Sequence, residues 1–261
     1  MERDLTKGNI AAGIVLFSLP LMAGNLLQQF YNVADTWIVG RYLGKDALGA
    51  VGSSYTLMTF ITSVILGLCM GSGAAASVFY GEKSEKRLRE CVFRAFAGIS
   101  VISVLLCVVS YVFCDGILSL LRVPASVVPT MKDYLLIVFA GIVPVFFYNF
   151  FSSFLRAIGN SATPLVFLSV AACMNVGLDF LFVAGLGAGV KGAALATVIA
   201  QSFSGVGITV FFFLKYKHMI PRKEDLAGDP LVVSSVGRLS VMNCLQQSIM
   251  NLGILAVQGL V

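Results

Sequence analysis

Residues Ile10–Val39 read IAAGIVLFSLPLMAGNLLQQFYNVADTWIV, an apolar run that carries a single formal charge, Asp35. About 20 apolar residues in helical conformation suffice to cross the hydrocarbon core of a membrane. The run is too long for the apolar part of a signal peptide, and no small-residue cleavage site follows a short one. It therefore predicts a membrane-spanning helix that remains in the protein.

Further apolar segments follow the first along the chain. They are Ser53–Phe79, Cys91–Cys114, Tyr134–Leu155, Thr163–Ala184, Gly192–Leu214 and a seventh from Leu231 to Val261. The composition agrees, because 58% of the residues are hydrophobic and only 12% are charged, against about 25% charged residues in soluble domains. The segments are too long for strands and show no alternation of apolar and polar residues. The predicted fold class is all-α, a polytopic membrane helical bundle.

The lysines and arginines between the segments indicate the orientation. Twelve lie before the first segment and around the second, fourth and sixth connections, and five lie in the first, third and fifth connections. Positively charged loops remain in the cytoplasm, so we expect a multi-pass protein of the cell membrane with a cytoplasmic N-terminus. The net charge of +5 is then a signal of topology in the lipid bilayer, and no nucleic acid partner is expected.

Two acids, Asp35 and Asp179, lie inside apolar segments, where a carboxylate costs about 2.5–3.5 kcal/mol on insertion scales. With this topology, Asp35, Asp179 and Thr197 lie at similar depths, roughly 7 Å below the outer boundary. Asn175 is one helical turn from Asp179. Two carboxylates, an amide and a hydroxyl suit a hard monovalent cation, or a proton. In the alternative interpretation, each acid sits at a helix end and reaches water.

Three stretches resemble one known family of transporters. LPLMAGNLLQQFYNVADTWIVGRYLG (Leu19–Gly44), FLRAIGNSATPLVFLSVAACMNVGLDFLFV (Phe154–Val183) and GVKGAALATVIAQ (Gly189–Gln201) are similar, in order and spacing, to the multidrug and toxic compound extrusion (MATE) family. Members of that family have twelve helices in two lobes and export amphipathic, often cationic compounds in exchange for Na+ or H+. The resemblance implies a secondary active transporter, with no enzymatic activity and no cofactor apart from the coupling ion.

The resemblance also assigns roles to individual residues. It implies a site for Na+ or H+ at Asp35, Asn175, Asp179 and Thr197, the set that the depth comparison also selects. Asn149 is expected in the substrate cavity because the family's first-lobe cavity includes its counterpart. Gln28 is a polar group at membrane depth, for which substrate contact and hydrogen bonding between helices are both open. Pro20 disrupts the hydrogen bonds of the first helix, and either a mobile bend or a static kink would follow.

The chain is expected to hold residues 1–214 as a six-helix lobe, 215–230 as a cytoplasmic linker and 231–261 as the first helix of a second lobe. The motif Leu-Leu-Gln-Gln at residues 26–29 recurs as Cys-Leu-Gln-Gln at residues 244–247, which favours a two-lobe plan. We therefore expect a fragment whose missing partner is the C-terminal lobe. A natural half-transporter that dimerises is the alternative.

Two other functions are compatible with a chain of several membrane-spanning helices. A flippase for lipids or lipid-linked saccharides shares the two-lobe plan, but such proteins line their cavity with basic residues, and the first six segments hold none beyond Arg94 near one end. An intramembrane aspartyl protease needs acids in short signatures with an adjacent glycine, whereas the contexts here are Gly-Leu-Asp-Phe and Ala-Asp-Thr. Both remain open as alternatives, and a multidrug antiporter is the favoured prediction.

Overall fold

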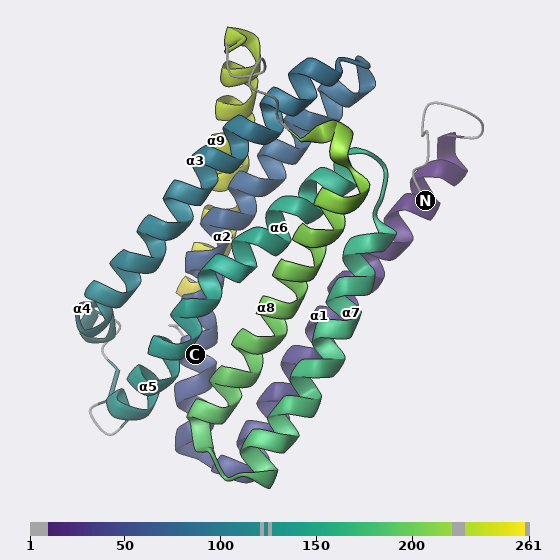
Figure 1. Cartoon of the computed structure of the whole chain (residues 1–261). Coiled ribbons are helices and arrows are strands. Elements are labelled where there is room, and N and C mark those ends of the chain that lie inside the picture. Colours follow the sequence, from purple (N-terminus) through teal and green to yellow (C-terminus); the bar gives the residue numbers. More distant parts are fainter. Residues whose placement is uncertain (1–9, 121–122, 125–126, 221–227, 259–261) are drawn as a thin grey trace.

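The computed structural model describes residues 10–120, 123–124, 127–220 and 228–258, which form helices and no strand (Figure 1). The helices are α1 (Ile10–Leu43), α2 (Lys45–Gly81), α3 (Glu85–Val112), α4 (Cys114–Leu120), α5 (Val128–Val138), α6 (Ile142–Ala157), α7 (Ala162–Asp179), α8 (Gly189–Lys215) and α9 (Pro230–Gln258). Short 3-10 turns occupy Phe139–Gly141 and Lys217–Met219, and a π-helical turn occupies Phe180–Gly185.

The first connection is much shorter than the apolar pattern indicates. Gly44 alone separates α1 from α2, and its φ of 87° is a conformation that favours glycine. The second helix therefore begins at Lys45, whereas Ser53 was predicted. Apolar content marks the part of a helix inside the bilayer, and the polar turns beyond it remain helical.

The fourth predicted segment is interrupted. The 3-10 turn Phe139–Gly141 separates α5 from α6, and Pro144 lies just beyond it. Proline has no N–H to bond to the carbonyl four residues earlier, and its ring clashes with that turn. The continuous helix predicted over Tyr134–Leu155 is therefore two helices in line.

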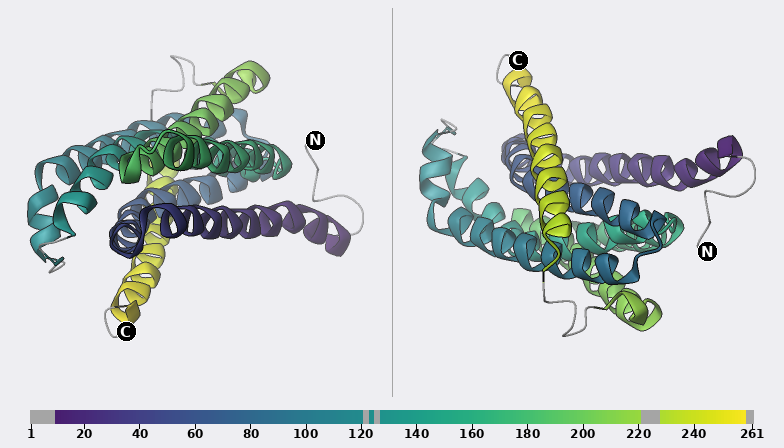
Figure 2. Two further views of the ribbon diagram at one scale, coloured as in Figure 1. Left: turned by 90° about the horizontal axis from the view of Figure 1, so that it is seen from below. Right: turned by 90° about the horizontal axis from the view of Figure 1, so that it is seen from above.

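Helix α2 lies at the centre of the bundle. It packs against α1, α3, α5, α6 and α9, while α8 packs against α5, α6 and α7. A cluster of phenylalanines fills the space between α3, α6 and α8: Phe96, Phe146, Phe147, Phe150, Phe151, Phe154 and Phe212. Helix α9 crosses the other long helices at a steep angle (Figure 2). It is attached to the bundle chiefly through α2, with a smaller contact on α3.

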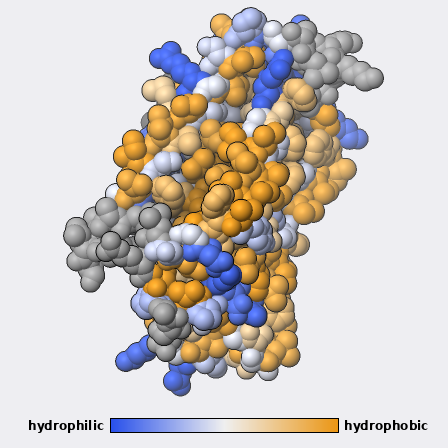
Figure 3. Space-filling view, turned by 90° about the vertical axis from the view of Figure 1, so that its left-hand side faces the viewer, coloured by the Kyte–Doolittle hydropathy of each residue, from blue (hydrophilic) through white to orange (hydrophobic). Residues whose placement is uncertain are grey.

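Within the described residues, six helical segments are long and apolar enough to cross a membrane. They are Gly13–Leu43, Ala47–Gly81, Glu85–Val112, Val128–Ala157, Ala162–Gly185 and Gly189–Lys215. Figure 3 shows the consequence on one face, a broad apolar band with hydrophilic side chains toward the upper and lower ends. The seventh predicted segment is helical as α9, but its hydropathy is lower because Arg238 and several amides interrupt it.

Some predictions concern residues outside the described part of the chain. They are Arg3 and Lys7, which are the basic residues counted before the first segment, residues 221–227 of the predicted linker and residues 259–261 of the seventh segment. Helix α8 ends at Lys215 and α9 begins at Pro230. The division of the chain into two lobes and a linker therefore stays a prediction.

Candidate functional site

Four of the predicted site residues lie together where α1, α7 and α8 pack against one another. Asp35 of α1 and Asp179 at the end of α7 are close enough to interact directly. The Asn175 Nδ2 amide, one turn before Asp179, lies 3.4 Å from the Thr197 Oγ1 hydroxyl of α8. We refer to Asp35, Asn175, Asp179 and Thr197 as the aspartate site.

The aspartate site is buried and short of hydrogen-bond donors. Asp179 is 0% exposed and Asn175 is 2% exposed. Among the described residues, no donor reaches Asp35 Oδ1, Asn175 Oδ1 or either carboxylate oxygen of Asp179. Buried polar atoms normally have a partner. Four unpartnered oxygens on neighbouring residues of α1 and α7 therefore fit a positively charged ligand.

Two tyrosines that the sequence reasoning did not select border this site. Tyr31 lies one turn before Asp35 and within electrostatic range of both aspartates. Tyr134 of α5 is 5% exposed, faces both aspartates and interacts with the hydroxyl of Thr197. The spacing from Asp35 was a usable signal for Tyr31. No local pattern marked Tyr134, because its helix joins the site only through tertiary packing.

The π-helical turn Phe180–Gly185 begins directly after Asp179. Its wider turn is held by hydrogen bonds from the Leu186 N–H to the Leu181 carbonyl and from the Ala188 N–H to the Phe182 carbonyl. On the other side, a Cβ added to Gly192 would lie 3.0 Å from Phe182 Cβ, so α8 packs closely on this turn. Turns of this kind occur frequently at functional sites.

The structure does not bring the other predicted residues into the aspartate site. Gln28 is exposed on α1. Asn149 is half-buried on α6 and donates a hydrogen bond to the Val145 carbonyl of its own helix. Pro20 is half-buried within α1, which runs as one continuous helix through it. The structure leaves the roles predicted for these three residues untested.

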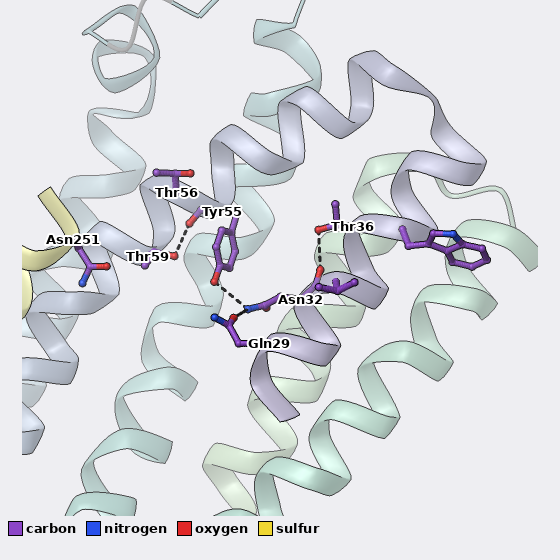
Figure 4. A pocket seen from close by; sticks show the side chains of 9 residues that line it. Gln29, Asn32, Thr36, Tyr55, Thr56, Thr59 and Asn251 are labelled. Atoms are coloured by element: carbon purple, nitrogen blue, oxygen red, sulfur yellow. Dashed lines mark hydrogen bonds between the residues drawn. The ribbon is translucent and has the colours of Figure 1, made fainter. Parts of the chain in front are cut away.

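A cavity of about 700 Å³ lies between α1, α2 and α9. Its lining consists of Gln29, Asn32, Val33, Thr36, Trp37, Tyr55, Thr56, Thr59 and Asn251. In Figure 4 the side chains of Gln29, Asn32 and Tyr55 point toward one another. The Asn32 Nδ2 amide donates to the Tyr55 hydroxyl at 3.0 Å and to the Gln29 Oε1 at 3.3 Å. We call this the polar cavity; its lining has aromatic and uncharged polar groups and no formal charge.

Helix α1 is a wall shared by the two sites. Asn32 and Thr36 face the polar cavity, while Tyr31 and Asp35, one residue before each, face the aspartate site. Successive residues of an α-helix point about 100° apart, which accounts for this division. A rotation or bend of α1 would therefore alter both sites together.

Comparisons with known proteins agree on one family of membrane transporters. The MatE family model matches residues 20–181. The chain is 32% identical to the probable multidrug resistance protein YpnP of Bacillus subtilis (strain 168), over 99% of this chain and 58% of that protein. The chain thus spans little more than half the length of this relative.

Two solved structures share the fold. One is an outward-facing conformation of a MATE transporter of the MOP superfamily, with a TM-score of 0.87 and 22% identity over 95% of this chain and 55% of that one. The other is an inward-facing conformation, with a TM-score of 0.79 and 22% identity over 86% of this chain and 51% of that one. Both neighbours are transporters.

Proposed function

This chain belongs to the MATE family, and from that premise we propose that it forms one lobe of a cation-coupled exporter of amphipathic or cationic compounds. The observation that carries the proposal is the position of α1 between the aspartate site and the polar cavity. One helix then transmits a change at the first site to the second. Transport proceeds by alternating access, with Na+ or H+ moving in the opposite direction to the exported compound.

The aspartate site is the coupling site. Asp35 Oδ1 and both carboxylate oxygens of Asp179 have no donor among the described residues, so a bound Na+ or proton supplies the missing positive charge. Asn175 Oδ1 and the Thr197 hydroxyl add neutral oxygens, which suit Na+. Binding relieves the repulsion between two carboxylates held close together.

The polar cavity receives the exported compound. Its lining combines the rings of Trp37 and Tyr55 with amide and hydroxyl groups, which suits a molecule with both apolar and polar parts. The lining holds no lysine or arginine, and a lipid-linked phosphate would want such a partner. This favours an exporter of amphipathic compounds over a lipid flippase.

Coupling follows from a difference in affinity between two conformations. If the cation prefers one position of α1 and the exported compound prefers the other, each ligand promotes release of the other. With the orientation expected from the positively charged loops, the upper end of Figure 1 lies on the cytoplasmic side of the cell membrane.

The test is efflux of a fluorescent cationic compound from cells that produce the full-length protein. Asp35→Asn and Asp179→Asn are each expected to abolish efflux while the protein still inserts into the membrane. Asp133→Asn is the matched control, because Asp133 is an exposed acid that pairs with Lys191 at the surface, and it should leave efflux unchanged. Normal efflux from either aspartate-site variant would overturn the assignment of the coupling site.

A further inference from the structure

Helices α5 and α6 follow one another along the chain but are separated by the 3-10 turn Phe139–Gly141. Pro144 explains only the α6 side of this break, because it has no N–H to offer to the carbonyl of Ala140. The carbonyls of Leu136 and Phe139 lie on the α5 side, where the proline removes no donor. Another group must therefore account for the way in which α5 ends.

The hydroxyl of Tyr111, on α3, occupies the end of α5. It donates a hydrogen bond to the Leu136 carbonyl at 2.7 Å, and the Ala140 backbone N–H bonds to the same hydroxyl. In an uninterrupted α-helix, the carbonyl of Leu136 would accept from the N–H of Ala140, four residues further on. The hydroxyl therefore lies between two backbone groups that pair with each other in a regular helix. Insertion of a side chain into this ladder is a recognised cause of helix kinks.

The ring of Tyr111 holds its hydroxyl at the break. It packs edge-on against the ring of Phe139, with centroids 5.6 Å apart and planes at 75°. One turn earlier on α3, the Cys107 Sγ lies 3.5 Å from the Phe139 carbonyl. From α8, the side chain of Gln201 packs on the same turn, since a Cβ added to Gly141 would lie 2.5 Å from its Oε1. The break is therefore a fixed feature of the bundle, held by side chains of α3 and α8.

The break sets the direction of α5, and α5 carries Tyr134 to the aspartate site. Tyr134 lies six residues before Ala140, about 9 Å along the helix axis. It faces both aspartates and interacts with the hydroxyl of Thr197. A change of direction of about 20°, the size of a helix kink, would move Tyr134 by about 3 Å; the buried Met131 and Leu135 anchor α5 and reduce that shift. A misplacement of only about 1 Å can cost a preorganised site about a hundredfold in activity.

We propose that Tyr111 is a positioning residue for the coupling site, because its hydroxyl, inserted into the backbone ladder at the end of α5, fixes where Tyr134 stands against the two aspartates. Without the hydroxyl, the Leu136 carbonyl loses its donor from α3, and lipid offers no water to replace it. The substitute along the chain is the N–H of Ala140, and that bond extends α5 across the break. The inference rests on the proposed function, since the aspartate site is taken as the coupling site, and it adds a residue from a helix outside that site.

The first experiment compares Tyr111→Phe with Tyr148→Phe in the purified full-length protein. The Tyr148 hydroxyl donates to the Pro164 carbonyl at 3.1 Å, so both variants lose a bond of the same kind, but only the first loses it at the break. The readout is thermal unfolding in detergent over a series of sodium concentrations, with choline as the substitute ion. Tyr111→Phe should bind sodium roughly tenfold more weakly than wild type. Tyr148→Phe should bind it as wild type does, and the two variants should unfold at similar temperatures without sodium.

The second experiment measures the position of α5 and needs neither ion nor transport. Asp133, next to Tyr134, pairs with Lys191 of α8 at 3.2 Å, and both side chains are more than half exposed. Asp133→Cys and Lys191→Cys place thiols across this contact, and a short bifunctional thiol reagent should join them quickly in a protein whose other cysteines are replaced. The cross-linking should slow when Tyr111→Phe is added and keep its rate when Tyr148→Phe is added.

Equal cross-linking rates in the two variants, or a Tyr111→Phe protein that binds sodium as tightly as a sodium-stabilised wild type, would overturn the positioning role. A wild type that sodium fails to stabilise contradicts the proposed sodium coupling instead. The cross-linking rates then decide the role of Tyr111 on their own, so the two failures are distinguishable.

Discussion

Replacing Asp179 by asparagine tests whether this acid binds the coupling ion or stabilises the fold. In the wild type, Asp179 is 0% exposed and neither of its carboxylate oxygens receives a hydrogen bond from the described residues. When the carboxylate is ionised, its charge is therefore a cost to the ligand-free protein, of the order of 2.5–3.5 kcal/mol on insertion scales. An asparagine side chain of the same shape avoids most of that cost. Asp179→Asn should therefore raise the free energy of unfolding by roughly 2 kcal/mol in the absence of sodium.

The same substitution should weaken ion binding. Removing one partner of a buried charged cluster typically costs about 3–5 kcal/mol, so the affinity for Na+ should fall at least about a hundredfold. Sodium at a hundred times the wild-type Kd stabilises the wild type by about 2.7 kcal/mol. At the same concentration the variant would gain only about 0.4 kcal/mol. Stability without sodium and stabilisation by sodium therefore change in opposite directions.

The assay is thermal unfolding of the purified full-length protein in detergent, with and without sodium and with choline as the substitute ion. Asp133→Asn controls for the loss of an acid at the surface, since its carboxylate pairs with Lys191 and both side chains are exposed. A variant Asp179→Asn that unfolds at a lower temperature than wild type without sodium would refute the reasoning. It would mean that the carboxylate is held by donors and serves the fold.

Three further outcomes are expected. Tyr55→Phe removes the hydroxyl that accepts a hydrogen bond from Asn32 at 3.0 Å. In a competition assay, this change should weaken the binding of substrates with hydrogen-bonding groups by about 1 kcal/mol and leave the binding of cations without such groups unaffected. Gly205→Ala drives a methyl group to 2.5 Å from the Pro144 carbonyl, which should cost about 1–3 kcal/mol of stability; Gly98→Ala is the matched control, and equal unfolding temperatures would contradict the packing. Asp229 has a pKa below its ordinary 3.8, because the Leu231 N–H and the Arg87 side chain bond to its charged form. The Asp229 carboxylate should contribute its full stabilisation above pH 3.8 and lose it as the pH falls through the lowered pKa. The difference in Tm between wild type and Asp229→Asn should therefore narrow below pH 3.8.

The aspartate site was partly visible in the sequence. Asp35 and Asp179 were conspicuous because a charge in an apolar segment is costly wherever the helix lies, and Asn175 followed from helical spacing. Tyr134 was invisible, because no periodicity relates residue 134 to residue 35. The polar cavity was also beyond sequence reasoning: Gln28 was selected, whereas the adjacent Gln29 lines the cavity, because the rotation of α1 about its axis depends on the helices packed against it.

The sequence by itself determined that the chain is helical and crosses a membrane, because an apolar helix satisfies its own backbone hydrogen bonds and needs no partner to be stable in lipid. It also determined the family, through residues that lie in order along the chain. The tertiary structure alone decided which helices touch. Gly67 and Gly71 are four residues apart in a run rich in small residues, and only the crossing of α9 distinguishes them from glycines such as Gly98 that meet nothing. Contacts between helices depend on side chains far apart in the chain, so both sites exist only once the bundle has assembled.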